Sequence, residues 1–364
     1  MRHLLLLLWC SGIPASLVQW QFGSEEEFLD NNRRWRAVYR NYSHDSAKRA
    51  EFRRESNHPA CQQQQQQQQQ KSLASSDAVL FRMHTTTSAR WSRFNAALSD
   101  FRTAKYAVHV SVDTTYYEAS SAHVVSLLQP LLHKRLIARL HLYNDSQILA
   151  AYPGLVALQQ HLPQWFFREK RPSWARLFHL EALMLWWRDA RRSPSAPSRV
   201  WVVEDDVGVA GGSLLDFVRL FEGRGEDLVT YGAFFTIYNE KEREDWRRRW
   251  IFSDVVSPAL ARAVHERDQQ YTHEHVQRFS SRALESYRAL LRRRMHAQSE
   301  LGSLTLLARI CPELSVLQMP RDVIGGRGDN YTVDGIVSPE AWRRELQASA
   351  GKEKAPRLFH ALKW

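Results

Sequence analysis

The sequence predicts an α/β fold in which a mostly parallel sheet is flanked by helices. Along residues 78–235, apolar segments of strand length alternate with segments whose apolar residues recur at helical spacing. Strands that alternate with helices form right-handed crossover units, which make successive strands parallel. The chain has 364 residues, 44% of them hydrophobic, which is enough for a sizeable core. We therefore expect one α/β domain over residues 78–364.

The expected elements follow in chain order. Strands are expected at residues 78–83, 106–112, 136–143, 199–203 and 227–235, and helices at residues 90–101, 122–132, 173–190, 214–221 and from Ser281 onward. Ligands of such sheets bind beyond the carboxyl ends of the strands. The expected binding loops are therefore residues 84–86, 113–114, 144–145 and 204–206.

The amino-terminal part predicts a secretory route. Residues 1–19 have a basic start, a short apolar run and small residues, which is typical of a signal peptide; a short signal-anchor is the alternative. Residues 20–77 contain an unbroken glutamine run and read as a largely disordered stem. N-glycosylation sequons at Asn41, Asn144 and Asn330 agree with this route. An oxidising lumen would permit a disulfide between Cys61 and Cys311, although the sequence does not show that they meet.

The net charge of +11 favours polyanionic partners without selecting one. Arginine runs at residues 247–249 and 292–294 accompany no nucleic-acid-binding motif, so we expect no nucleic-acid partner. His273 and His275 would face apart on a helix but could share a face of a strand, where they would form a weak second metal site. Walker and Gly-x-Ser-x-Gly sequences are absent from the chain.

An acidic triplet is the most informative feature of the sequence. Glu204, Asp205 and Asp206 directly follow a five-residue apolar strand. Three adjacent carboxylates are costly to bury without partners, and a divalent cation would keep them ionised. Oxygen ligands suit Mg²⁺ or Mn²⁺. A solvated turn, or a helix start favoured by the helix dipole, is the alternative.

Residues 200–212 (VWVVEDDVGVAGG) resemble the DxD-type segment of GT-A-fold glycosyltransferases, a family that uses nucleotide-sugar donors. The segment Gln298-Ser299-Glu300-Leu301 resembles the family's acidic residue at the start of a later helix, and Phe359-His360 its late histidine. The resemblance covers residues 78–364. The ending Phe-His-x-x-Lys is similar to that of GT-A-like proteins from protists and algae. The first acidic position is Glu204 where the family usually has Asp.

The resemblance implies a GT-A-like, Rossmann-like fold and a metal centre. It assigns Asp206 and His360 to the metal, Mn²⁺ or Mg²⁺, and makes Asp205 and Glu204 ligands of the metal or of the donor. It also implies a UDP- or GDP-sugar as the donor and co-substrate.

Four further residues receive roles. The resemblance makes Glu300 the catalytic base that takes the proton of the acceptor hydroxyl. Lys363, three residues after His360, would assist the leaving diphosphate if the tail folds over the site. Asp113 and Thr85, at earlier strand ends, are candidates for binding the donor nucleoside, although for Asp113 a cap of the next helix is the favoured interpretation.

The expected function is a metal-dependent glycosyltransferase of the Golgi or ER lumen, or secreted, with membrane association through the amino terminus as a further expectation. It would move a hexosyl or related sugar to a hydroxyl of a glycan or glycoprotein, with inversion as the expected outcome, although the sequence does not settle the stereochemistry. Two alternatives stay open. One is a catalytically inactive carbohydrate-binding or scaffold module of the same fold. The other is a metal-dependent phosphoesterase, which usually needs a second set of metal ligands.

Overall fold

The computed structural model describes residues 77–84, 86–115, 118–161, 174–231, 256–264, 269–270, 272–311, 313–320, 323–324, 337, 339–349, 355–360 and 362. The expected signal, almost all of the stem, Cys61 and the sequons at Asn41 and Asn330 lie outside these residues, as do Thr85 and Lys363. In the described part, no helix is both long and apolar enough to cross a membrane.

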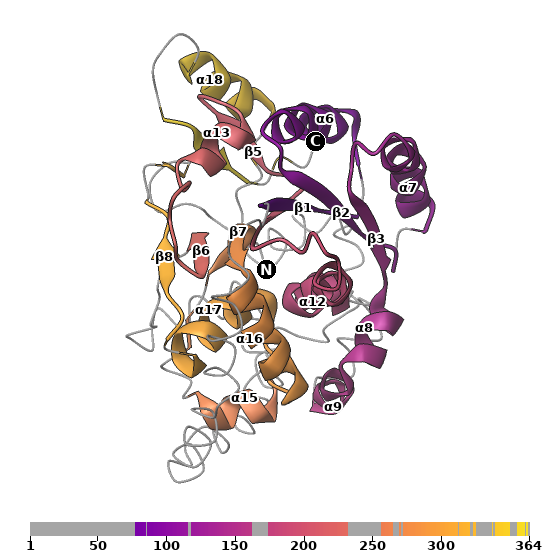
Figure 1. Cartoon of the computed structure of the whole chain (residues 1–364), viewed down its shortest axis with the longest axis vertical. Coiled ribbons are helices and arrows are strands. Elements are labelled where there is room, and N and C mark those ends of the chain that lie inside the picture. Colours follow the sequence, from indigo (N-terminus) through magenta and orange to yellow (C-terminus); the bar gives the residue numbers. More distant parts are fainter. Residues whose placement is uncertain are drawn as a thin grey trace, which may run out of the picture.

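A seven-stranded sheet forms the centre of the molecule (Figure 1). Its strands, in spatial order, are β3 (Arg139–Tyr143), β2 (Ala107–Asp113), β1 (Ala78–Met83), β4 (Arg199–Glu204), β7 (His273–Ser280), β6 (Leu228–Tyr231) and β8 (Val316–Gln318). β7 is antiparallel to both of its neighbours, and the remaining strand pairs are parallel. The prediction of a mostly parallel sheet is therefore confirmed. The sequence did not predict β7, which opens with His-Glu-His and has few apolar residues.

Helices cover both faces of the sheet. α6 (Ser88–Thr103), α7 (Glu118–His133) and α13 (Leu214–Arg219) pack on one face, with Phe101 and Phe217 among the residues of that core. α12 (His179–Ala190), α15 (Pro258–Ala263), α16 (Ser281–Arg292) and α17 (Ser299–Ile310) pack on the other face, as Figure 1 shows for α12, α16 and α17. The two cores follow from the alternation along β1, where Leu80 faces one and Phe81 the other.

A third, smaller cluster lies beside β3. It is built from α8 (Asp145–Ala151), α9 (Pro153–His161), α11 (Trp174–Leu177) and part of α12. The helix expected over residues 173–190 is in fact interrupted at Phe178, whose φ of −127° and ψ of 66° are not helical. Phe178 is fully buried and its ring stacks on Trp174 at a centroid distance of 5.2 Å. The segment is therefore divided into α11 and α12, with His179 as the first residue of α12.

Candidate metal centre

The acidic triplet lies where strands of opposite direction meet. Glu204 is the last residue of β4 and pairs in register with Arg82 of β1. On its other side, Val203 is paired with Val276, so Glu204 lies beside His275. The antiparallel direction of β7 brings its amino-terminal residues to the edge formed by the carboxyl ends of β1 and β4. One oxygen of Glu204, Oε1, accepts a hydrogen bond from Arg82 at 2.9 Å, and the other, Oε2, lies 2.5 Å from Nδ1 of His275.

The carboxyl-terminal tail brings His360 to the same place. β9 (Arg357–Phe359) pairs antiparallel with β5 (Gly208–Ala210), the short strand that follows the acidic triplet. Beyond it, the Leu362 amide donates to the carbonyl of Asp206 at 2.7 Å. A Cβ at position 208 would come within 2.3 Å of Leu362 Cδ1, so a glycine there permits the close packing of the tail. Nε2 of His360 consequently lies 3.1 Å from Oδ1 of Asp206 and 3.4 Å from Oε2 of Glu204.

Glu204, His275 and His360 form a cluster that suits a metal ion. Each offers one ligand atom, and the three atoms lie within 4.8 Å of one another. The rings of His275 and His360 stack at a centroid distance of 3.3 Å. Asp206 Oδ1 is buried and accepts no well-aligned hydrogen bond from the described residues, although His360 lies beside it. Imidazole nitrogens and carboxylate oxygens are both common ligands of divalent metals, so these residues fit such an ion.

The charges of the cluster compensate one another. Burial alone would raise the pKa of Glu204, but His275, His360 and Arg82 together hold this pKa well below its usual range. Burial opposes the charged form of His360, yet Asp206 and Glu204 raise its pKa to about 9. The same ion pair lowers the pKa of Asp206 despite its burial. A positive charge is thus stable between the two carboxylates, and a bound metal would displace the proton of His360.

Asp205 has a different environment from its two neighbours. Its Oδ2 lies 3.3 Å from Nη1 of Arg90 in α6, and both residues are buried. Burial raises the pKa of Asp205 to about 7, against the opposing effect of Arg90. Asp205 is not a member of the Glu204, His275 and His360 cluster. In this structure the Asp205 carboxylate therefore links the end of β4 to α6.

Glu274 and His179 extend the site toward α12 and α17. Nδ1 of His179 lies 2.6 Å from Oε1 of Glu274 and 4.0 Å from Oε1 of Glu204. Burial, reinforced by Glu204, raises the pKa of Glu274 to about 8. The backbone amide of His179 donates to Oγ of Ser299, which itself donates to the carbonyl of Leu177 at 2.8 Å. The first turns of α12 and α17 are thereby joined next to the metal cluster.

Glu300, the expected catalytic base, lies in the first turn of α17 and is largely buried. Its carbonyl accepts a hydrogen bond at 2.8 Å from the amide of Thr272, the residue before β7. Because β7 begins at the edge of the sheet where Glu204 ends β4, Glu300 lies at the edge that carries the metal cluster.

The expected donor-binding residues are only partly described. Asp113 ends β2, and its Oδ1 accepts hydrogen bonds from the amide of Thr115 at 2.9 Å and from its hydroxyl at 2.6 Å. The carboxylate of Asp113 thus closes the turn after β2, five residues before α7 begins at Glu118. Asn144, of the sequon in the next loop, caps α8 by accepting from the amide of Gln147 at 3.0 Å.

The contribution of β7 to the site was not predicted from the sequence. His273 and His275 were expected to form only a second metal site, separate from the acidic triplet, and that separation is wrong. The two histidines do lie on a strand, with ring centroids 6.0 Å apart, but His275 contacts Glu204 and stacks on His360. The His-Glu-His spacing was the available signal, and only the position of β7 next to β4 connects it to the triplet.

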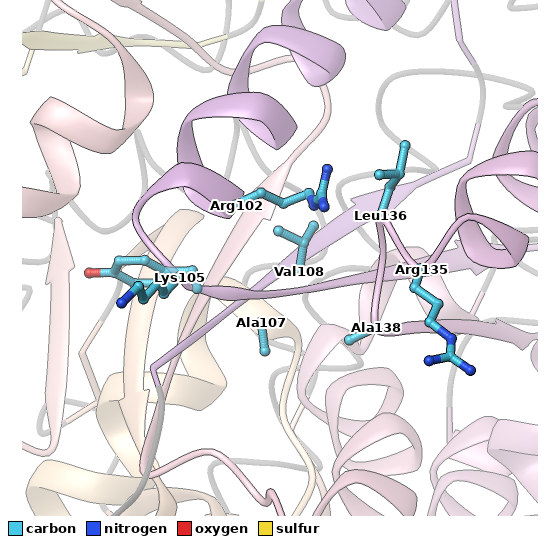
Figure 2. A pocket seen from close by; sticks show the side chains of 8 residues that line it. Arg102, Lys105, Ala107, Val108, Arg135, Leu136 and Ala138 are labelled. Atoms are coloured by element: carbon cyan, nitrogen blue, oxygen red, sulfur yellow. The ribbon is translucent and has the colours of Figure 1, made fainter.

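A surface hollow lies at the opposite edge of the sheet (Figure 2). It has a volume of about 220 Å³ and is lined mainly by residues around the start of β2 and the turn after α7, including Arg102, Lys105 and Arg135. Lys105 and Arg135 both have positive φ angles, of 64° and 55°. Because the hollow is at the amino-terminal end of β2, it is separate from the candidate metal centre at the carboxyl ends of the strands.

Comparisons with known proteins show only distant likeness. No protein-family model matches the chain, and no curated protein matches it. Solved structures that resemble it include mouse xyloside xylosyltransferase 1 in its apo form, with 13% identity, a TM-score of 0.37, and coverage of 79% of this chain and 98% of that one. Glucosyl-3-phosphoglycerate synthase from Mycobacterium tuberculosis, in complex with Mn²⁺, UDP and phosphoglyceric acid, has 15% identity, a TM-score of 0.35, and coverage of 76% and 79%. A mannosyltransferase from S. cerevisiae in complex with GDP has 10% identity, a TM-score of 0.30, and coverage of 77% and 83%. Likeness at this level does not transfer a site or a substrate to this chain.

Proposed function

We propose that this protein is a metal-dependent glycosyltransferase that uses a nucleotide-sugar donor. One observation carries the proposal: His360, from the last residues of the chain, lies 3.1 Å from Asp206 and 3.4 Å from Glu204, at the carboxyl end of a central strand. The sequence resemblance assigns Asp206 and His360 to the metal of a GT-A-type site. The edge of the sheet where they meet is the place where α/β sheets bind ligands.

In this proposal Glu204, Asp206 and His360 hold the metal. A bound divalent ion supplies a Lewis acid that neutralises the negative charge developing on the leaving diphosphate. Arg82 orients Glu204 through the hydrogen bond to Oε1. Arg93 donates to the carbonyl of Leu362 at 2.8 Å and so keeps the tail over the site. Lys363, the next residue, is proposed to face the leaving diphosphate.

The acceptor hydroxyl needs a base if transfer proceeds with inversion. We assign this role to Glu300, because the first turn of α17 is attached to the start of β7 through Thr272. The Glu274–His179 pair lies beside Glu204 and joins the site to the first residue of α12. Asp205, held by Arg90, and Asp113 remain the proposed contacts for the donor, together with Thr85.

The donor, the acceptor and the compartment are proposed from the sequence resemblance to GT-A-fold glycosyltransferases. The donor is a UDP- or GDP-sugar, the transferred group is a hexosyl or related sugar, and the acceptor is a glycan or glycoprotein. The working compartment is the Golgi or ER lumen, reached through the signal at residues 1–19. Kinship with protist and algal proteins that share the Phe-His-x-x-Lys ending belongs to the same proposal.

The test is the Mn²⁺-dependent release of nucleoside diphosphate from a panel of UDP- and GDP-sugars, with the full chain as enzyme. We expect release from one donor, and a loss of at least about 100-fold in Asp206→Asn, since a ligand to the developing charge is removed. Asp189→Asn, a matched change at the solvent-facing end of α12, should retain full activity.

Other results would identify the alternatives. Metal-dependent hydrolysis of a phosphate monoester, without release from any nucleotide sugar, would indicate a phosphoesterase. Glycan binding that is unchanged in Asp206→Asn, with no turnover of any donor, would indicate a binding module.

A further inference from the structure

We infer that His275 is a protein ligand of the metal ion and that the centre therefore selects a transition-metal ion over Mg²⁺. This inference rests on the proposed function only in placing a divalent ion at this cluster. It adds a ligand from β7, so the centre has two imidazoles where the sequence resemblance expected only that of His360.

The position of His275 is determined by the sheet. β7 pairs with β4 from Arg199–Ser280 to Val203–Val276, and the next residues along this register are Glu204 and His275. Nδ1 of His275 lies 2.5 Å from Oε2 of Glu204, the oxygen that Arg82 does not occupy. A residue held in this way by a central strand has little freedom to leave the site.

The spacing of the ligand atoms fits a single ion. Two atoms bound to one ion at about 2.1 Å lie at most about 4.2 Å apart. The ligand atoms of Glu204, His275 and His360 lie within 4.8 Å of one another, so only small side-chain movements are needed for all three to bind. Asp206 Oδ1, next to His360, is available as a further oxygen ligand.

The chemistry of the ligands decides the class of ion. Mg²⁺ prefers oxygen ligands and keeps several waters, whereas imidazole suits zinc, iron, nickel and copper. Two imidazoles and one or two carboxylates therefore favour a first-row transition metal. For such a site, affinity for divalent ions rises from Mn²⁺ through Co²⁺ toward Zn²⁺. The second oxygen of Glu204, hydrogen-bonded to Arg82, supplies the supporting contact that orients a metal-binding carboxylate.

This inference is tested by calorimetry. The metal-free full chain is titrated with Zn²⁺, Mn²⁺ and Mg²⁺ in separate experiments. In the wild type we expect Zn²⁺ to bind at least about 10-fold more tightly than Mn²⁺, and Mg²⁺ at least about 100-fold more weakly than Mn²⁺. His275→Gln should lose at least about 10-fold in affinity for Zn²⁺ and Mn²⁺ and change little toward Mg²⁺. His133→Gln, at the exposed end of α7, is the matched control and should bind like the wild type.

A second variant keeps the test decisive if His275→Gln folds poorly. His275→Asp replaces the nitrogen by oxygen, so it should narrow the difference in affinity between Mn²⁺ and Mg²⁺. If both folded variants bind Zn²⁺ and Mn²⁺ with the same affinities as the wild type, His275 is not a ligand. Binding of Mg²⁺ as tight as that of Mn²⁺ to the wild type would overturn the selectivity.

The inference and the proposed function fail in distinguishable ways. Metal selectivity that depends on His275, in a protein that binds no nucleoside diphosphate with any metal, would contradict the glycosyltransferase proposal alone. Nucleotide binding that requires Mn²⁺ equally in wild type and in His275→Gln would contradict the inference alone.

Discussion

Among single residues, histidines have two opposite environments. His109 packs edge-on against Trp186 at a ring-centroid distance of 5.2 Å, and burial lowers its pKa to about 4. His360 is half-buried, and Asp206 and Glu204 raise its pKa to about 9. Burial therefore favours the neutral form of both histidines, and only at His360 do two carboxylates outweigh it.

Below pH 6.5, the change of the free energy of unfolding with pH depends on histidines that burial keeps neutral. Burial lowers the pKa of His109 and His141 to about 4 and that of His273 to about 3, whereas in the unfolded chain they titrate near 6.5. Their contribution is present above pH 6.5 and is lost as the pH falls through these lower values. Burial raises the pKa of Asp205 to about 7 and that of Glu274 to about 8. These two groups stabilise the folded protein as the pH falls, but they are fewer than the three histidines.

Above pH 6.5, the free energy of unfolding depends on protons that the folded protein retains and the unfolded chain loses. The stabilisation from charged His360 is fully present below about pH 6.5 and is lost as the pH rises through about 9. Glu274 retains its proton to about pH 8 and also lowers stability as the pH rises. We therefore predict that the free energy of unfolding of the metal-free protein is greatest near pH 6.5.

Urea unfolding in the presence of a chelator, at pH 5, 6.5 and 9, measures this profile. His109→Gln should flatten the acid side, and His360→Gln should flatten the alkaline side. A wild-type stability that does not fall between pH 6.5 and pH 9 would show that His360 is not charged in the metal-free protein.

At the level of elements, local pattern decides which parts of the site could be predicted. β4 is an apolar run followed by acidic residues that begin with Glu204, so both the strand and the acidic site could be predicted from the sequence. β7 has the sequence HEHVQRFS, and it is a strand because β4 and β6 lie on either side of it. β5 and β9 have three residues each and pair across about 150 positions of the chain. His275 was therefore missed as part of the site, while His360 was expected only through the family resemblance.

The tail formed by β9 and Leu362 provides an element-scale prediction. Leu362 is fully buried against Gly208 and Trp342, and its amide holds the carbonyl of Asp206. Leu362→Ala should lower stability by about 2–5 kcal/mol, as is usual for a buried leucine. It should also weaken Mn²⁺ binding by at least about 10-fold, because His360 is no longer fixed. Calorimetry under conditions where the variant is folded measures the affinity.

Leu346→Ala is the matched control, since Leu346 is exposed on α18 (Pro339–Ser349). It should change stability by less than about 0.5 kcal/mol and leave Mn²⁺ binding unchanged. Unchanged Mn²⁺ affinity in folded Leu362→Ala would show that the position of His360 does not depend on the packing of the tail.

On the scale of the whole molecule, the sheet brings together distant parts of the chain. Glu204 ends β4, His275 lies in β7 and His360 directly follows β9, and their ligand atoms lie within 4.8 Å of one another. The α/β class could be predicted from alternating patterns, because each pattern is local. The insertion of an antiparallel strand between β4 and β6 could not, because it depends on pairing between residues more than 70 positions apart.

The central claim is that a metal ion and a nucleoside diphosphate bind together at Asp206. The most direct measurement is the melting temperature of the full chain with a panel of nucleoside diphosphates, with and without Mn²⁺. A ligand that binds only the folded state raises this temperature by mass action. We predict an increase that requires both Mn²⁺ and one nucleotide, that is lost in Asp206→Asn and that is retained in Asp189→Asn. A cooperative transition that no nucleotide shifts, or a shift that survives in Asp206→Asn, would contradict the account.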